Sequence, residues 1–404
     1  MEEMAKVQCK SLDRISVLPQ DTIENILTHM PIRDALRTSI LSKKWRHYWK
    51  GMPKLVFDDE YLKGMPKLVY DTPFSYTSSS SKENISLSMP SSMFCCYTMV
   101  ILEFSISINT DAKIVDEIDQ IIFHLSKSKN IKKFIFKFWS KYNFSLEYVK
   151  RYKLPSMFFS LQGLEHLHLT HCVIELPLTF DGFITLRSLE LFDANITAQT
   201  LQQILTNCPI LEEFILMGCQ NDSTTQGDKC TFLELSERLP LVQVLKISKS
   251  YIKQHVTTND MKKLLTSLVH LRILCFDVCF QKEDGLSYAL NVISSSPNLE
   301  KIKIELCLNH ELCGEETCND LLDLQDYSGI NLDHLEELEI TNFGNYDPEM
   351  EFLKLIMAKS PLLKKARIKL SKSVSVDKEV KMLRDLLRLT FPRASPAVDI
   401  IIER

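Results

Sequence analysis

Four side chains in one short stretch have the residue types that bind metal ions. They form the pattern Cys307-x-x-His310-x-x-Cys313, which Cys318 follows. Thiolates and imidazoles are the usual zinc ligands, but structural zinc sites draw paired ligands from two separated places in the chain. All four residues lie in one segment, so we interpret them as reduced loop thiols and expect no metal site.

The remaining residues give no pattern that indicates catalysis. The adjacent Cys95 and Cys96 are interpreted as packing residues rather than as a redox pair. The chain has only 10 glycines, which leaves little room for a phosphate-binding loop. No Ser/His/Asp or Cys/His arrangement has a recognisable local signature. We therefore predict no catalytic site, no cofactor and no enzymatic activity.

The composition is typical of a globular protein, with 45% apolar and 25% charged residues. A length of 404 residues predicts two or three domains. The first residues lack an apolar core, so we expect no secretory signal. The longest apolar run, residues 93 to 102, is shorter than the ~20 residues that span a bilayer, so no membrane association is expected. Twelve cysteines without a regular framework predict reduced thiols, and hence the nucleus and/or the cytoplasm.

Residues 18 to 49 predict three short helices. Pro19 suits the first turn of the first helix, and Pro31 ends it. A second pattern runs from Ile32 to Ile40, and Ser42 has the position of an N-cap for the third. The apolar residues spaced for one face of a helix are Ile23, Ile26, Leu27, Met30, Leu36, Leu41, Trp45 and Trp49. Helices this short cannot enclose those side chains, so the segment is interpreted as a docking module.

The charge of this module favours a protein partner. Residues 10 to 54 contain nine Lys or Arg and four Asp or Glu, although the whole chain has a net charge of −4. The basic residues lack the interleaved aromatic side chains of a base-stacking surface, so we expect no nucleic acid. Steering toward an acidic protein is the better interpretation.

The segment from residue 58 to residue 110 is interpreted as a linker. Only residues 101 to 108 alternate as a strand does. Residues 51–57, Gly-Met-Pro-Lys-Leu-Val-Phe, recur as residues 64–70 with Tyr in the last place. One copy suffices as the strand that leaves the module, so the second copy is expected to be dispensable.

From residue 131 onward, the pattern apolar-x-x-apolar-x-apolar repeats nine times. It occurs at Ile131/Phe134/Phe136, Leu164/Leu167/Leu169, Leu186/Leu189/Leu191, Leu211/Phe214/Leu216, Val242/Leu245/Ile247, Leu271/Leu274/Phe276, Leu299/Ile302/Ile304, Leu335/Leu338/Ile340 and Leu363/Ala366/Ile368. Amphipathic helical patterns lie at residues 200–207, 260–268, 287–294 and 349–359, after one at 115–125. This spacing is typical of leucine-rich repeats, which stack strand–helix units into a solenoid with an inner parallel sheet.

Residues between the apolar positions of each repeat should face away from the core. Ile215, Val244 and Ile273 would then form an apolar patch, either for a target or beneath a covering loop or helix. Further along, Lys303, Glu339 and Arg367 form a ladder of alternating charge on neighbouring strands. These six residues are the candidate target-binding residues.

Several segments resemble plant F-box/FBD/LRR-repeat proteins. Asp13-Arg14-Ile15-Ser16-x-Leu18-Pro19, Ile26-Leu27-x-x-Met30-Pro31 and Arg37-Thr38-Ser39-x-Leu41-Ser42-Lys43-Lys44-Trp45-Arg46 are similar to an F-box. Leu154-Pro155-Ser156-x-x-Phe159 and Cys208-Pro209-x-Leu211-Glu212 resemble the leucine-rich region, and residues 335 to 368 resemble the FBD segment. The resemblance implies an adaptor-binding surface made by Leu18, Pro19, Ile23, Ile26, Leu27, Pro31, Leu36, Leu41, Ser42, Trp45 and Trp49.

The predicted fold class is therefore α/β, a short helical F-box followed by a leucine-rich-repeat solenoid. The expected domains are an F-box (10–57), a linker (58–110), the solenoid (111–330) and FBD-like C-terminal repeats (331–404). The resemblance implies a substrate receptor that binds a Skp-type adaptor and, through it, a cullin-RING ubiquitin ligase. A small-molecule-gated receptor and an interaction scaffold outside a ligase are the alternatives. Neither the target nor any ligand can be named from the sequence.

Overall fold

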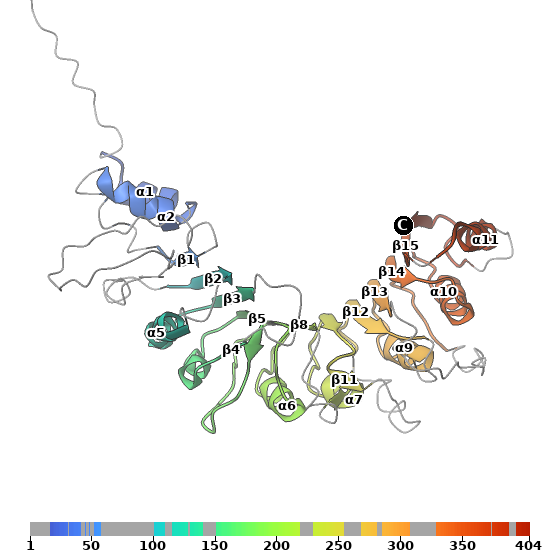
Figure 1. The fold of residues 1–404 in the computed structure, drawn as a ribbon, viewed down its shortest axis with the longest axis horizontal. Helices are drawn as coiled ribbons and strands as arrows, with labels where there is room; N and C mark the ends of the chain where they lie inside the picture. Colours follow the sequence, from blue (N-terminus) through green and yellow to red (C-terminus); the bar gives the residue numbers. More distant parts are fainter. Residues whose placement is uncertain are drawn as a thin grey trace, which may run out of the picture. The chain divides into compact units, whose positions relative to one another are not determined.

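The computed structural model describes residues 17–30, 32–41, 45, 48, 52–57, 101–109, 115–127, 130–139, 151–218, 229–253, 268–280, 285–307, 329–372, 374–387 and 393–404. The chain divides into two compact units, residues 1–142 and residues 143–404. Most of their helices and strands are labelled in Figure 1.

The first unit begins with the predicted helices. These are α1 (Gln20–Thr28), α2 (Ile32–Arg37) and a following 3₁₀ turn, η1 (Thr38–Ile40). The carbonyl of Pro19 accepts the N–H of Ile23 at 3.1 Å and so starts the hydrogen bonds of α1. Ile23 and Leu27 are fully buried, as expected of one apolar face. The third predicted pattern, from Ser42 to Trp49, lies mostly outside the described residues.

Three parallel strands follow in the first unit. β1 (Lys54–Phe57), β2 (Glu103–Asn109) and β3 (Lys133–Trp139) pair in that order, with α5 (Val115–Ser126) connecting the last two. Phe104 lies at their centre, with ring centroids 5.8 Å from Phe57 and 5.4 Å from Phe134. β2 occurs where the alternation of residues 101 to 108 predicts a strand, inside the segment interpreted as a linker. The repeated copy at residues 64–70 is outside the described residues.

The second unit contains a parallel sheet of nine strands. In spatial order they are β5 (His166–Thr170), β7 (Ser188–Phe192), β8 (Glu213–Met217), β10 (Val244–Ile247), β12 (Ile273–Val278), β13 (Lys301–Leu306), β14 (Glu337–Phe343), β15 (Lys365–Leu370) and β16 (Asp399–Glu403). Each predicted repeat contains one strand, with β3 as the first of the nine. The strand β16 was not predicted.

The connections in the second unit contain its helices and two short strand pairs. The helices are η5 (Ser156–Ser160), α6 (Ala198–Thr206), α7 (Phe232–Ser236), α9 (Gly285–Ser294), α10 (Asp347–Lys359) and α11 (Val376–Leu387). The pairs are β4 (Tyr152–Lys153) with β6 (Cys172–Val173), and β9 (Cys230–Thr231) with β11 (Ile252–Lys253). Three predicted helices are present as α6, α9 and α10, and the one at residues 260–268 is outside the described residues except for its last residue, Leu268.

The core of the second unit lies between the sheet and these helices. Figure 1 shows α6, α7, α9 and α10 along the same side of the strands. Alternate strand residues point to that side and are buried, as in the intermediate–buried alternation of β12 and β15. We call the opposite side, formed by the intervening residues, the open face.

Each of the first strands of this sheet ends in a left-handed turn. His171, Asp193 and Gly218 follow β5, β7 and β8 with φ of 54°, 49° and 117°. The first two values are accessible to residues with a side chain, but the third is adopted readily only by glycine. A Cβ on Gly218 would also lie 2.2 Å from Oδ1 and 2.8 Å from N of Asp193.

We expect Gly218→Ala to lower the free energy of unfolding by about 2–3 kcal/mol, because the substitution adds backbone strain and a clash. Chemical denaturation of the purified chain measures this loss. Gly329→Ala is the matched control, since a Cβ there meets nothing within 4 Å and its φ is not positive. Equal stability of the two variants would contradict the turn geometry.

Candidate protein-binding site

The predicted adaptor-binding residues divide into buried and exposed groups. Ile23, Leu27 and Trp45 are buried in the chain itself, so they support the module from inside. Pro19, Ile26 and Leu41 are exposed, and Leu18 is half-buried. Pro31, Ser42, Trp49 and the side chain of Leu36 lie outside the described residues. Adaptor contact by any of these residues stays a prediction.

Two further apolar side chains of the module are more exposed than Ile26 and Leu41. Val17 is 73% exposed and Ile40 is 86% exposed. Exposed isoleucine and valine side chains on a small helical module are the kind of surface that a partner covers. Sequence reasoning missed Val17 because it precedes α1, and missed Ile40 because η1 breaks the helical period after Arg37.

The centre of the open face in the second unit contains both apolar and charged side chains. Val244 and Ile273 are direct neighbours in register and are half-buried. Ile215 instead lies beside Lys246, one row further along the strands, and is only 4% exposed. The alternative of an exposed apolar patch is therefore wrong for Ile215, which is buried within the chain, as the covered alternative expects.

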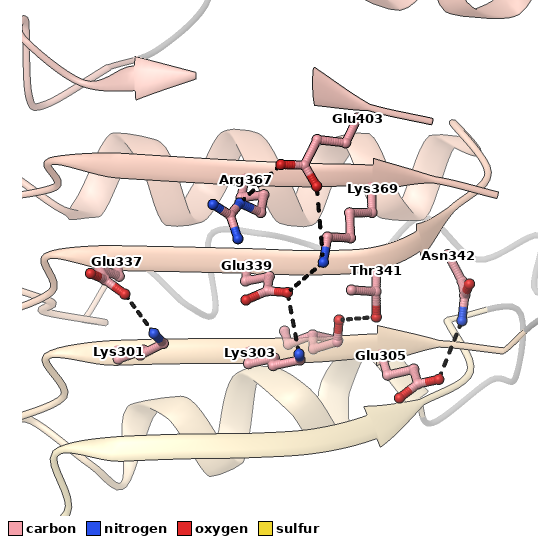
Figure 2. Close-up of polar contacts among 11 residues, drawn as sticks. Lys301, Lys303, Glu305, Glu337, Glu339, Thr341, Asn342, Arg367, Lys369 and Glu403 are labelled. Carbon is pink, nitrogen blue, oxygen red and sulfur yellow. Dashed lines mark hydrogen bonds and ion pairs between the residues drawn. The ribbon is translucent and has the colours of Figure 1, made fainter. Parts of the chain in front are cut away.

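The predicted charge ladder has the expected register. Lys303 is directly opposite Glu339, and Glu339 is directly opposite Arg367. The ion pairs do not all join directly opposite residues, as Figure 2 shows. Glu339 binds Lys303 at 3.2 Å and Lys369 at 3.3 Å. Arg367 instead lies 3.3 Å from Glu403, on the unpredicted strand β16.

On β15, Glu339 contacts its diagonal neighbour Lys369, two residues beyond the directly opposite Arg367. The pairing of β14 with β15 is irregular between Ile340 and Phe343, and Asn342 there has a φ of 62°. Figure 2 shows Lys369 and Lys303 both pointing toward the Glu339 carboxylate. A second pair, Lys301 with Glu337 at 2.6 Å, lies one row away. The charges in these rows largely neutralise one another within the chain.

The ionisation of the ladder acids follows from these pairs. The hydrogen bond and the charge of Lys301 hold the pKa of Glu337 below its ordinary value, and Glu337 in turn raises the pKa of Lys301. Burial of Glu339 opposes its ionisation. The hydrogen bonds and charges of Lys303 and Lys369 outweigh that burial, so the pKa of Glu339 is also lowered. Both acids are therefore carboxylates at neutral pH.

Burial disfavours the nucleophilic thiolate form of Cys172, Cys208 and Cys275. Burial raises the pKa of Cys172 and Cys275, and raises that of Cys208 to about 12. No group of three or more potential metal ligands occurs in the part of the chain that the structure describes. His310, Cys313 and Cys318 lie outside that part, so the expectation of no metal there stays a prediction. No helix among the described residues is long and apolar enough to cross a membrane.

Three family models match successive parts of the chain. The F-box domain model matches residues 15–57, which include α1, α2 and β1. The model "FBD-associated F-box protein At5g56370, LRR repeats" matches residues 120–227. The FBD model matches residues 331–368, which contain β14, α10 and most of β15.

Relatives from Arabidopsis thaliana are similar over most of the chain. The F-box/FBD/LRR-repeat protein At1g13570 is 26% identical over 97% of this chain and 99% of its own length. The probable FBD-associated F-box protein At1g32375 is 22% identical over 97% of this chain and all of its own length. The F-box protein At5g03100 is 28% identical over 70% of this chain and 78% of its own length. With matches to an F-box, leucine-rich repeats and an FBD segment in that order, the chain is similar in sequence and in domain order to the F-box/FBD/LRR-repeat proteins of plants.

Proposed function

We propose that this chain is the substrate-recognition subunit of a Skp–cullin–F-box type ubiquitin ligase. The N-terminal unit binds a Skp-type adaptor, and the nine-stranded sheet holds a target protein. The observation that carries the proposal is the match of residues 15–57 to the F-box, together with the exposed apolar side chains within that segment. An F-box implies adaptor binding, and exposed apolar surface supplies most of the free energy of such an association.

The chain itself performs no chemistry in this proposal. Ubiquitin transfer takes place on other subunits, and this chain contributes proximity by raising the local concentration of the target. The open face suits a protein target because it offers half-buried apolar residues, Val244 and Ile273, beside rows of charged ones. We place the complex in the nucleus and/or the cytoplasm, since the cysteines follow no disulfide framework.

The proposal is tested by purification of the tagged chain from plant cells with the proteasome blocked. A Skp-type adaptor and a cullin should co-purify, and ubiquitinated proteins should be enriched. Leu18→Ala with Pro19→Ala should lose the adaptor, the cullin and the ubiquitinated proteins together, while its thermal unfolding stays unchanged. Capture of the same proteins with neither adaptor nor cullin present would assign the chain to a scaffold outside a ligase.

A further inference from the structure

A lysine and a cysteine from different repeats approach each other at one edge of the sheet. Lys249 lies two residues after β10, and Cys307 directly follows β13, with β12 between the two strands. The Nζ atom of Lys249 is 2.7 Å from the Sγ atom of Cys307. The two residues are 58 positions apart in the chain, so only the stacking of the repeats brings them together.

This distance is short for a contact that involves sulfur. Other hydrogen bonds of cysteine sulfurs in the described residues measure 3.4, 3.5, 3.7 and 3.9 Å. A hydrogen bond to sulfur is long because the sulfur atom is large. Nitrogen and sulfur that are each bonded to one shared oxygen atom are held closer than van der Waals contact allows. The folded chain therefore holds Nζ and Sγ close enough for one oxygen atom to bridge them.

Both residues are fixed by contacts with their neighbours. The backbone N–H of Lys249 donates to the carboxylate of Asp277, and its carbonyl accepts from Nζ of Lys229 at 3.3 Å. The thiol of Cys307 donates to the carbonyl of Val278 at 3.5 Å. Lys249 is exposed and Cys307 is half-buried, so a small oxidant in solution can reach the pair.

We propose that Lys249 and Cys307 form a reversible nitrogen–oxygen–sulfur link under oxidation by peroxide. In the first step hydrogen peroxide oxidises the thiol, R–SH + H₂O₂ → R–SOH + H₂O, and an S–O bond replaces the S–H bond. In the second step a further peroxide accepts two electrons as the N–O bond forms. That step is R–SOH + R′–NH₂ + H₂O₂ → R–S–O–NH–R′ + 2 H₂O. Excess dithiol returns the amine, the thiol and water.

The link would tie together the carboxyl ends of β10 and β13 across β12. These strands display Val244, Ile273 and Lys303 on the open face. The modification therefore lies beside the surface that the proposed function assigns to a target. It does not depend on that function, because its formation is measured on the isolated chain.

Intact-mass and peptide mass spectrometry of the purified full chain test the proposal. After reduction and then peroxide treatment, the linked species gains one oxygen and loses two hydrogens, about +14 Da. Trypsin together with a glutamate-specific protease releases Cys307 between Glu305 and Glu311, apart from Cys313 and Cys318. We expect one cross-linked peptide that contains Lys249 and Cys307, and its loss on treatment with dithiothreitol.

Lys249→Arg and Cys307→Ser should each abolish the cross-linked peptide. Cys275→Ser should retain it, since Cys275 is a half-buried thiol of the neighbouring strand β12 with lysines on either side of it in register. The circular dichroism of all variants serves as the check of folding. A gain of one or more oxygens on Cys307 with Lys249 unmodified would overturn the proposal, and so would a disulfide of Cys307.

Discussion

Changing Ile40→Ser together with Leu41→Ser is expected to weaken binding of a Skp-type adaptor by about 100-fold. Ile40 is 86% exposed and Leu41 is 50% exposed, so in the isolated chain both side chains face water. Burial of an isoleucine or leucine side chain in an interface contributes about 1.5–3 kcal/mol. A loss of about 3 kcal/mol for the pair corresponds to two factors of ten in the dissociation constant. Titration calorimetry with the purified adaptor measures the change.

Two controls separate this effect from damage to the fold. Leu178→Ser removes a fully exposed leucine from the second unit and should leave adaptor binding unchanged. Leu27→Ser affects a fully buried residue of α1, so it should lower both stability and binding. The double variant should match wild type in thermal unfolding. Adaptor binding at full strength by that variant would mean that the adaptor covers a different part of the module.

The strands could be predicted because each repeat buries all three of its apolar positions, the last two of them on the strand itself. In the fourth repeat of the series, Phe214 and Leu216 are fully buried on β8, two residues apart as a strand requires. The strand β16 was not predicted, because its residues Ile400, Ile401 and Ile402 are consecutive and show no alternation of apolar and polar residues. All three are half-buried. Its pairing with β15 comes from the neighbouring strand rather than from its own pattern.

The candidate site could be predicted only in part, because exposure and partner choice depend on packing. Ile23 and Ile26 have the same helical spacing pattern, yet the first is fully buried and the second is 40% exposed. The register of Lys303, Glu339 and Arg367 followed from counting residues within the repeats. The partners did not, because Glu339 contacts its diagonal neighbour Lys369 rather than the directly opposite Arg367. No local signal in the sequence marks which of two neighbouring cations an acid contacts.

The low pKa of Glu339 makes the stability contribution of the ladder depend on pH. The folded-state pKa lies below the ordinary value of 4.5, so the contribution is fully present above about pH 4.5. It is lost as the pH falls through the folded-state pKa, where the carboxylate becomes protonated. Any difference in stability that arises from the charge of Glu339 should therefore narrow between pH 7 and pH 3.

Glu339→Lys is expected to destabilise the second unit by about 2 kcal/mol. The side chain of Glu339 is only 15% exposed and binds two lysines, so removal of its charge leaves Lys303 and Lys369 without their shared partner. The new cation adds repulsion in a row that already contains Arg367. A loss of this size should lower the midpoint of thermal unfolding by roughly 4–8 °C. Calorimetry at pH 7 measures it.

Charge-swap variants test whether the ladder only stabilises the fold or also recognises a target protein. Adding Lys303→Glu and Lys369→Glu to Glu339→Lys restores both contacts of position 339 and should recover most of the lost stability. Substituting Arg367→Glu for Lys369→Glu should recover less, because Lys369 contacts Glu339 whereas Arg367 pairs with Glu403 at 3.3 Å, closer than the 3.9 Å between Lys369 and Glu403. Proximity labelling in cells with the proteasome blocked then compares captured proteins. A structural ladder predicts that the first triple variant captures the wild-type set. A recognition role predicts recovered stability with lost capture, since complementary charge sets specificity more than affinity. Equal recovery by the two triple variants would contradict the contacts of Glu339.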